Sequence, residues 1–321
     1  MFTLKKIGIL TSGGDSQGMN SAIRSVVKTG INNGFEMIGI KRGYKGLMEN
    51  DFSKLELKDV GDILYRGGTF LQSARSEEFK TEHGQLKAIN NLKKAEIDYL
   101  VVIGGDGSYR GADALGKRGI KTYGLPGTID NDIPLTDYTI GFDTTLNVVT
   151  DAIGNLRDTM SSHERVSVIE VMGRNAGDIA LQAGISSGVD AILIPELEWD
   201  ITKVSNRLKH GFEEGKTHSI VMVAEGAGKA EDIATLIREH TDLDTRSTVL
   251  GHIQRGGTPS AFDRIFTSRM GHEVINLIKQ DISGVALGME KNKITYHTFD
   301  EIFKSKDVFD KKLYEIFEDL V

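Results

Sequence analysis

The stretch Tyr99-Leu100-Val101-Val102-Ile103-Gly104-Gly105-Asp106-Gly107-Ser108 indicates how this chain folds. Its consecutive apolar residues are typical of a strand that is buried on both faces of a parallel sheet. Glycines follow the strand, and a helical pattern then continues to about Arg118. The other apolar runs of this kind are Lys5–Leu10, Met37–Ile40, Thr122–Leu125, Val166–Val171, Ala191–Ile194 and Ser219–Ala224. Because helical patterns lie between them, we expect an α/β fold with mostly parallel sheets.

The bulk composition is that of an ordinary globular enzyme, with 39% hydrophobic and 26% charged residues among 321. Two α/β domains of roughly 150 residues, or one large domain, are both compatible with this length. The segment from Met1 to Leu10 has no signal-peptide cleavage pattern, and no apolar run approaches the ~18 residues of a membrane span. The chain contains no cysteine, which excludes disulfides, thiolate metal sites and a cysteine nucleophile. We therefore expect a cytoplasmic protein without a membrane partner.

The charge balance argues mildly against a nucleic-acid partner. The formal net charge is −7, from 39 Lys plus Arg against 46 Asp plus Glu, whereas nucleic-acid binding usually requires a basic face. A small phosphorylated ligand needs only a local group of arginines, so it is not excluded.

Two glycine-rich turns that follow strands are candidates for phosphate binding. The first is Thr11-Ser12-Gly13-Gly14-Asp15, before a helix that starts near Met19. Backbone amides and a helix N-terminus suit an anion there, although a plain tight turn is the alternative. The segment fits neither the lysine-bearing P-loop nor the dinucleotide fingerprint. The second turn is Gly104–Ser108, in which Asp106 offers an oxygen ligand for Mg²⁺ and Gly107 places no charge against the phosphates. NAD kinases and lipid kinases share this second block in outline, so by itself it indicates only a phosphate-donor site.

The segment Pro126-Gly127-Thr128-Ile129-Asp130-Asn131-Asp132 carries the expected acid–base chemistry. One of its two carboxylates can accept the proton of an attacking hydroxyl, and the second can hold a metal or orient the first. Considered in isolation, the segment is also compatible with a solvated turn before Ile133-Pro134. Its position after a strand, beside the Gly104–Ser108 block, favours the catalytic interpretation.

Arginines beside glycines supply positive charge at other element ends. Such arginines suit a bidentate grip on phosphate, although any one of them alone is most simply a surface charge. Glu225 can accept hydrogen bonds from sugar hydroxyls. Considered in isolation, it is also compatible with a residue at the start of a helix. The segments concerned are Gly67–Arg75, Arg165, Met172-Gly173-Arg174, Arg246 and Gly251-His252-Ile253-Gln254-Arg255-Gly256-Gly257.

Taken in order, T-S-G-G-D, R-G-G-T, G-G-D-G-S, P-G-T-I-D-N-D, M-G-R and G-H-I-Q-R-G-G closely resemble the bacterial ATP-dependent 6-phosphofructokinases from about Lys5 to about Leu277. The resemblance implies transfer of the terminal phosphoryl group of Mg·ATP to the 1-hydroxyl of fructose 6-phosphate, the committed step of glycolysis. It implies two unequal three-layer α/β domains with mostly parallel sheets, with the active site between them, in a homotetramer. The larger, nucleotide-binding domain would be 1–140 and 254–304, and the smaller, sugar-phosphate-binding domain 141–253 and 305–321.

The resemblance also assigns roles to individual residues. Asp130 would be the general base, Asp132 a second carboxylate near it, and Asp106 the ligand of Mg²⁺. The other catalytic residues implied are Thr128, Arg174 and Gly14. The ATP-binding residues implied are Gly14, Tyr44, Arg75, Ser76, Gly105, Asp106, Gly107, Ser108 and Gly111. The substrate-binding residues implied are Thr128, Ile129, Asp130, Arg165, Met172, Gly173, Arg174, Glu225, Arg246, His252, Ile253, Gln254 and Arg255.

Two further implications concern assembly and regulation. Arg165 and Arg246 would reach the 6-phosphate from a neighbouring subunit, so that a monomer should be nearly inactive. A second site between subunits would bind the activator ADP or the inhibitor phosphoenolpyruvate. Its implied residues are Arg24, Lys28, Arg157, Asp190 and Lys216. Leu57 and Glu214 depart from the family pattern, because some members carry a cation at these positions. We therefore expect effector binding to be weaker than the family norm.

Three other functions agree less well with these residues than ATP-dependent phosphorylation of fructose 6-phosphate. Pyrophosphate-dependent relatives typically carry aspartate at the position of Gly107 and lysine at that of Gly127, so the two glycines favour ATP. A protein like the NAD or lipid kinases would leave Thr128–Asp132 and the segment His252–Arg255 without a role. A non-catalytic phosphate sensor would be expected to lack Asp106 or Asp130, and both are present.

Overall fold

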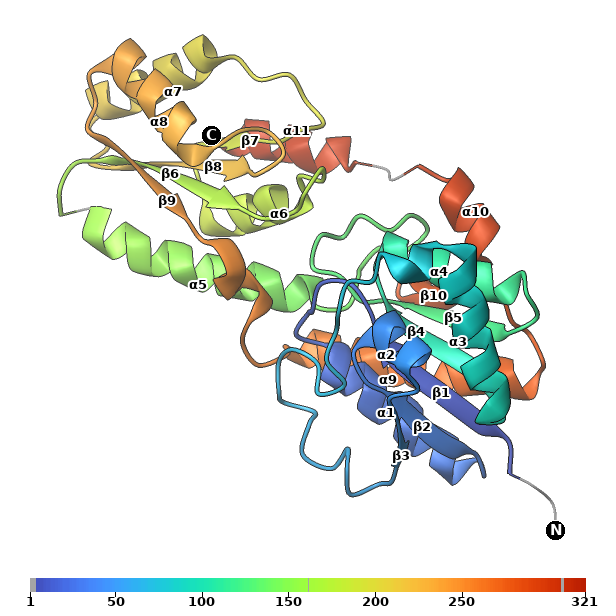
Figure 1. Cartoon of the computed structure of the whole chain (residues 1–321). Coiled ribbons are helices and arrows are strands. Elements are labelled where there is room, and N and C mark those ends of the chain that lie inside the picture. The colour runs from blue at the N-terminus through green and yellow to red at the C-terminus, as the bar shows by residue number, and fades with distance from the viewer. Residues whose placement is uncertain (1–3, 161, 307–308) are drawn as a thin grey trace. The chain divides into compact units, whose positions relative to one another are not determined.

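The computed structural model describes residues 4–160, 162–306 and 309–321, so the first three residues of the N-terminal segment considered above lie outside it. The described chain forms two compact units, which are labelled by element in Figure 1. Unit 1 contains residues 4–129, 133–144 and 255–306. Unit 2 contains residues 130–132, 145–160, 162–254 and 309–321.

Unit 1 is built on a seven-stranded sheet with the order β11-β10-β5-β4-β1-β2-β3 among the described residues. The strands from β10 to β2 run parallel, whereas the edge strands β3 and β11 are antiparallel to their neighbours. Parallel neighbours end at the same edge, so the loops after β1, β4 and β5 lie side by side. The strands are β1 (Lys6–Thr11), β2 (Glu36–Ile40), β3 (Phe52–Leu55), β4 (Ile97–Gly104), β5 (Lys121–Pro126), β10 (Val285–Glu290) and β11 (Lys293–Thr298).

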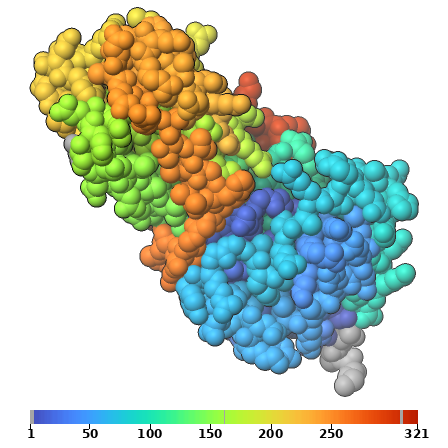
Figure 2. Space-filling model, turned by 60° about the vertical axis from the view of Figure 1, so that its left-hand side comes forward, coloured from blue at the N-terminus to red at the C-terminus, as the bar shows by residue number. Residues whose placement is uncertain are grey.

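Helices cover both faces of this sheet, because its central strands are apolar on both sides. In β4, Tyr99 and Val101 pack into the core beneath α1 and α9, whereas Leu100 and Val102 pack into the opposite core. The result is the predicted three-layer arrangement, and the N-terminal third of the chain covers much of its visible face in Figure 2. The helices are α1 (Met19–Asn32), α2 (Gly43–Glu49), α3 (Glu82–Lys94), α4 (Asp106–Gly116), α9 (Ala261–Lys279), α10 (Phe299–Lys304) and the short 3-10 helix η1 (Glu78–Lys80).

Unit 2 has a four-stranded sheet with the order β7-β8-β6-β9, in which each paired strand runs parallel to its neighbour. Val166 and Val168 of β6 face the core formed with α7 and α8, and α6 packs against β7 and β8. The strands are β6 (Val166–Val171), β7 (Ala191–Leu193), β8 (Ser219–Ala224) and β9 (Thr245–Val249). The helices are α5 (Phe142–Met160), α6 (Asp178–Ser187), α7 (Ile201–Glu213), α8 (Ala230–Thr241), α11 (Lys311–Leu320) and the 3-10 helix η2 (Gly251–Arg255).

The prediction of an α/β fold with mostly parallel sheets is confirmed. The segment after about Asp281, which the sequence pattern leaves uninterpreted, forms two strands of the unit 1 sheet followed by α10 and α11. Its half-exposed strand β11 mixes polar and apolar residues without the continuous apolar run of the central strands. Within the described residues, no helix combines the length and apolarity that a bilayer span requires.

Candidate functional site

The glycine turn after β1 lies open beside a guanidinium group. Gly13 adopts a φ of +87°, which favours glycine, and both Gly13 and Gly14 are exposed. A Cβ atom on Gly14 would lie 2.5 Å from Nη1 of Arg255, which donates a hydrogen bond to the carbonyl of Asp15 at 2.9 Å. The turn therefore combines bare backbone with a cation, an arrangement that suits a phosphate group.

The turn after β4 packs directly against the first turn. A Cβ atom on Gly104 would lie 2.4 Å from both the Ser12 carbonyl oxygen and Oγ of Ser108, so only glycine lets the two turns approach. Gly105 is the N-cap of α4 and has no side chain that could accept a hydrogen bond from the first amides of this helix. Because β1 and β4 are neighbours, the two predicted phosphate turns form one surface with uncapped amides.

Asp106 fits a magnesium ion that is bound mainly through nucleotide phosphates. Its carboxylate is 47% exposed and accepts a hydrogen bond from Nε of Arg110 at 2.9 Å. Among the residues that the structure describes, no three His, Cys, Asp or Glu side chains gather as a metal site. Magnesium usually keeps several waters and takes only one or two protein carboxylates beside substrate phosphates, which is compatible with a single half-exposed aspartate.

Of the other predicted ATP-site residues, some are exposed and others are buried behind the Gly104–Ser108 turn. Arg75 is exposed, and its neighbour Ser76 accepts a hydrogen bond from the amide of Phe79 at 3.2 Å. Tyr44 is buried, stacks on Phe79 and donates its hydroxyl to the Ser108 carbonyl at 2.6 Å. Burial raises the pKa of this phenol far above its ordinary value. A Cβ atom on Gly111 would lie 2.6 Å from the Tyr44 ring, so Gly111 makes room for a ring that supports the Gly104–Ser108 turn from behind.

The loop after β5 holds a buried carboxylate. The carbonyl of Thr128 accepts a hydrogen bond from Oγ1 of Thr139 at 2.7 Å, which fixes the start of the loop. Asp130 is only 1% exposed, and its Oδ2 lies 3.2 Å from Nε of Arg174. Asp132 is half-buried, whereas Ile129 is fully buried, so only the backbone of Ile129 can face a ligand. The loop therefore presents one carboxylate against one guanidinium.

The segment after β6 places the guanidinium by means of its backbone. Arg174 has a φ of +53°, in the left-handed region that non-glycine residues rarely adopt. Its amide donates to Oε1 of Glu225 at 2.8 Å, and the amide of Met172 donates to Oε1 of the buried Gln254 at 3.1 Å. Gly173 has a φ of +132°. His252 and Ile253 are exposed on η2. Apart from Arg165 and Arg246, the predicted sugar-binding residues all follow strand ends: Thr128, Ile129 and Asp130 after β5, Met172, Gly173 and Arg174 after β6, Glu225 after β8, and His252, Ile253, Gln254 and Arg255 after β9.

Comparison with known proteins identifies the family. The family model described as Phosphofructokinase matches residues 6–278. The chain belongs to the phosphofructokinase family. It is 54% identical over 317 residues to the ATP-dependent 6-phosphofructokinase of Halalkalibacterium halodurans, a match that covers 99% of both chains. It is also 54% identical over 313 residues to that of Listeria monocytogenes serovar 1/2a, with 98% of both chains covered.

Solved structures of phosphofructokinases share the fold. The phosphofructokinase of Saccharomyces cerevisiae has a TM-score of 0.90 and 34% identity, and the match covers 98% of this chain and 50% of the yeast chain. The pyrophosphate-dependent enzyme of Marinobacter aquaeolei has a TM-score of 0.86 at 19% identity, which is a likeness of fold alone.

In this member of the phosphofructokinase family, Arg165 and Arg246 lie at the opposite end of the unit 2 sheet. Arg165 comes directly before β6, and Arg246 is the second residue of β9. Both form ion pairs with Asp244, at 2.6 Å for Arg165 and 3.0 Å for Arg246. Sequence reasoning missed Asp244. The signal was available, because residues i and i+2 of a strand point to the same face, and Asp244 precedes Arg246 by two.

A polar pocket of about 330 Å³ in unit 2 contains three of the five predicted effector residues. Nζ of Lys216 lies 2.6 Å from Oδ1 of Asp190, while Oδ2 accepts the amide of Ile220 at 2.8 Å. Arg157 donates to the carbonyls of Ser187 and Gly188 beside it. The other two predicted residues, Arg24 and Lys28, lie on α1 of unit 1.

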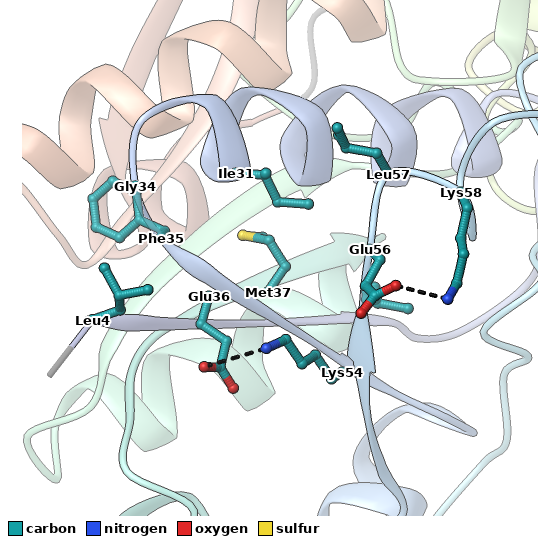
Figure 3. A pocket seen from close by; sticks show the side chains of 11 residues that line it. Leu4, Ile31, Gly34, Phe35, Glu36, Met37, Lys54, Glu56, Leu57 and Lys58 are labelled. Atoms are coloured by element: carbon teal, nitrogen blue, oxygen red, sulfur yellow. Dashed lines mark ion pairs between the residues drawn. The ribbon is translucent and has the colours of Figure 1, made fainter.

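A different pocket of about 490 Å³ lies between the end of α1 and strands β2 and β3 of unit 1. Ile31 and Met37 form part of its apolar wall, and the ion pairs Glu36–Lys54 and Glu56–Lys58 flank it in Figure 3. None of the predicted catalytic or binding residues lines this pocket. Its lining thus combines apolar side chains with two ion pairs that already neutralise its charges.

Proposed function

We propose that this chain transfers the terminal phosphoryl group of ATP to the 1-hydroxyl of fructose 6-phosphate, giving fructose 1,6-bisphosphate in the committed step of glycolysis. The observation that carries the proposal is the pairing of the 1% exposed Asp130 with Arg174 at 3.2 Å. The segment that leads to Asp130 begins at the end of β5, and β4 and β1, which carry the two glycine turns, are the next strands of the same sheet. The chain thus carries a candidate base, a candidate cation and two candidate anion-binding turns, which are the parts that phosphoryl transfer requires.

The environment of two glycines supports ATP as the donor. A Cβ atom on Gly107 would have no heavy atom of the described chain within 4 Å, so the fold leaves this space open to a nucleotide. A Cβ atom on Gly127 would lie 2.8 Å from Cγ2 of Ile103 and 3.1 Å from the Gly104 amide nitrogen. The lysine that pyrophosphate-dependent relatives typically carry at the latter position does not fit here without a shift of the loop.

In the proposed mechanism, Asp130 orients the 1-hydroxyl of the sugar and accepts its proton. An ordinary carboxylate is a weak base for an alcohol, but a loose transition state lets the hydroxyl lose its proton late. Arg174 neutralises the charge that develops on the transferring group, and the backbone of Gly14 together with Thr128 aligns it. Magnesium, when bound with ATP, neutralises phosphate charge, and Asp106 is the side chain that would hold it. We assign nucleotide binding to unit 1 and sugar-phosphate binding to unit 2.

The two ends of β6 support an active site that a second copy of the chain completes. Arg165 precedes this six-residue strand, whereas Met172 follows it. At about 3.3 Å per residue, the two positions are roughly 23 Å apart, which is longer than any one side chain. Arg165 and Arg246 therefore serve the 6-phosphate of a neighbouring subunit in our proposal, and a homotetramer is the assembly that we propose.

The polar pocket with Arg157, Asp190 and Lys216 is our proposed site for ADP or phosphoenolpyruvate. Its volume of about 330 Å³ and its two cations suit a small anion. One of these cations, Lys216, already forms an ion pair with Asp190 at 2.6 Å. An incoming anion therefore competes with the Asp190 carboxylate for Lys216. The cytoplasmic location expected from the sequence stays a prediction.

The test of the proposed function is a coupled assay of the purified chain with fructose 6-phosphate and a metal, comparing ATP with pyrophosphate. We expect turnover with Mg·ATP and little with pyrophosphate. The Asp130→Ser variant is the matched control, because it leaves both phosphate turns intact. A preference for pyrophosphate would overturn the choice of donor, and activity that survives in Asp130→Ser would overturn the choice of base.

A further inference from the structure

Two strand ends in unit 2 bring three charged residues together at an exposed position. In the parallel pair of β6 and β9, Val166 is the partner of Thr245 and Ser167 the partner of Arg246. The residues that precede these strands, Arg165 and Asp244, are therefore neighbours as well. The amide of Val166 donates to the Asp244 carbonyl at 3.0 Å, which fixes the backbone on both sides. The charged group is thus set by sheet register and not by loop conformation.

The Asp244 carboxylate bridges the two arginines with separate oxygens. Oδ2 accepts a hydrogen bond from Nε of Arg165 at 2.6 Å, and Oδ1 lies 3.0 Å from Nε of Arg246. In both arginines the contact with the carboxylate is made by Nε, the nitrogen nearest the chain. The hydrogen bond from Arg165, together with the charge of Arg246, lowers the pKa of the Asp244 carboxyl below its ordinary value. The carboxylate therefore stays ionised at neutral pH.

Without a carboxylate between them, the guanidinium groups of two neighbouring arginines repel each other, and their long side chains spread into solvent. A bridging carboxylate removes most of this repulsion and restricts both side chains before a ligand arrives. Guanidinium groups bind phosphate through a planar fork of N–H donors, so a group held at Nε still offers its Nη donors. Ordering these side chains in advance lowers the entropic cost of binding a phosphate.

We propose that Asp244 is a positioning residue for substrate binding: it holds Arg165 and Arg246 side by side, with their Nη donors directed to the 6-phosphate of fructose 6-phosphate. This inference rests on the proposed function and assigns to Asp244 a task that neither arginine can perform alone. Asp244 acts through the arginines and touches no reacting atom, so its effect falls on sugar-phosphate affinity and not on the chemical step.

The test uses the assembled enzyme in three forms, which are the unchanged protein, Asp244→Asn and Asp244→Glu. For Asp244→Asn we expect the KM for fructose 6-phosphate to rise about fivefold, which corresponds to the upper end of what an exposed ion pair contributes. The kcat and the KM for ATP should stay unchanged, and Asp244→Glu should restore most of the affinity. Calorimetric titration with fructose 6-phosphate in the absence of ATP should show the same order of affinities.

The matched control is Asp242→Asn, which removes one negative charge from the same turn. Asp242 is exposed, has a φ of +62° that asparagine tolerates, and forms no ion pair within the described residues. Its substitution should leave the KM for fructose 6-phosphate unaltered. In an Arg246→Ala background, the effect of Asp244→Asn should shrink, because part of what it positions is gone.

Other outcomes overturn the inference in distinguishable ways. A KM for fructose 6-phosphate that falls in Asp244→Asn would mean that the carboxylate competes with the phosphate. Parallel losses of kcat, ATP affinity and tetramer content by sedimentation would mean a structural role only. Failure of the unchanged enzyme to phosphorylate fructose 6-phosphate would instead overturn the proposed function, so the two failures cannot be confused.

Discussion

The two edges of the unit 2 sheet place arginines in different ways. At the carboxyl edge, Arg174 has its backbone held by Glu225 and faces the buried Asp130. At the amino edge, Arg165 and Arg246 have side chains that are 34% and 65% exposed, and the exposed Asp244 connects them. One edge positions charge through backbone geometry and burial, the other through ion pairs in contact with water.

This difference predicts two kinds of mutational effect. A buried carboxylate beside a cation interacts strongly because water does not screen it, and removal of one partner leaves the other uncompensated. An exposed ion pair contributes only about 0–1 kcal/mol. We therefore expect changes at the carboxyl edges to act on turnover or donor choice, and changes at the amino edge to act on affinity and on assembly.

The largest effect is expected for Asp130→Ser at the carboxyl edge. Loss of the base should lower kcat about 10³-fold or more, while affinity for the sugar phosphate is largely retained. Steady-state kinetics combined with a direct binding titration separates the two quantities. If kcat fell by less than about tenfold, Asp130 would not be the base, and the contrast between the two edges would disappear.

The second effect concerns Arg246→Ala at the amino edge. Loss of charged hydrogen bonds to the phosphate should lower kcat/KM by about 10²-fold. Because this arginine serves a neighbouring subunit in our proposal, a mixture of Arg246→Ala and Asp130→Ala chains should recover part of the activity. The parent activity should also fall on dilution, together with tetramer content. Mixed tetramers without any recovery would show that each chain completes its own site.

The third effect tests whether the carboxyl edge of unit 1 selects the donor. Gly107→Asp places a negative charge where the fold leaves open space, and like-charge repulsion should raise the KM for ATP by at least about tenfold. Gly107→Ala adds a Cβ atom without charge and is the matched control. The thermal midpoint of unfolding should stay the same in both variants. An aspartate variant with unchanged ATP kinetics would refute the assignment of this turn to the nucleotide.

The smallest effect is expected at the effector pocket. Glu214 is about 70% exposed, lies 3.5 Å from His210, and directly precedes Gly215 and Lys216, which line the pocket. Glu214→Lys reverses an exposed charge and should strengthen inhibition by phosphoenolpyruvate about fivefold at sub-saturating fructose 6-phosphate. Glu213→Lys, which makes the same change one residue earlier, should have less effect. Strong inhibition of the unchanged enzyme at micromolar phosphoenolpyruvate would contradict our expectation of weak regulation.

The sequence alone determined the class of fold and the family. Strands buried on both faces are continuous apolar runs, and they are visible because local pattern and burial agree. The prediction of phosphofructokinase membership is confirmed by the family match over residues 6–278. The glycine turns after β1 and β4 were also predictable as turns, since glycine marks positions where backbone approaches another segment closely; their binding of phosphate stays a prediction. The C-terminal strands were not, because β11 is a half-exposed edge strand that lacks such a run.

Only the tertiary structure decided which charges meet. The pairing of Asp130 with Arg174 joins residues from different loops, and no local pattern encodes it. The bridge formed by Asp244 depends on the register of β6 against β9, which brings residues 165 and 244 together across 79 positions of the chain. The burial of Tyr44 behind the Gly104–Ser108 turn has the same origin. Sequence patterns report what a residue needs locally, whereas strand pairing and helix packing determine which distant side chains become its neighbours.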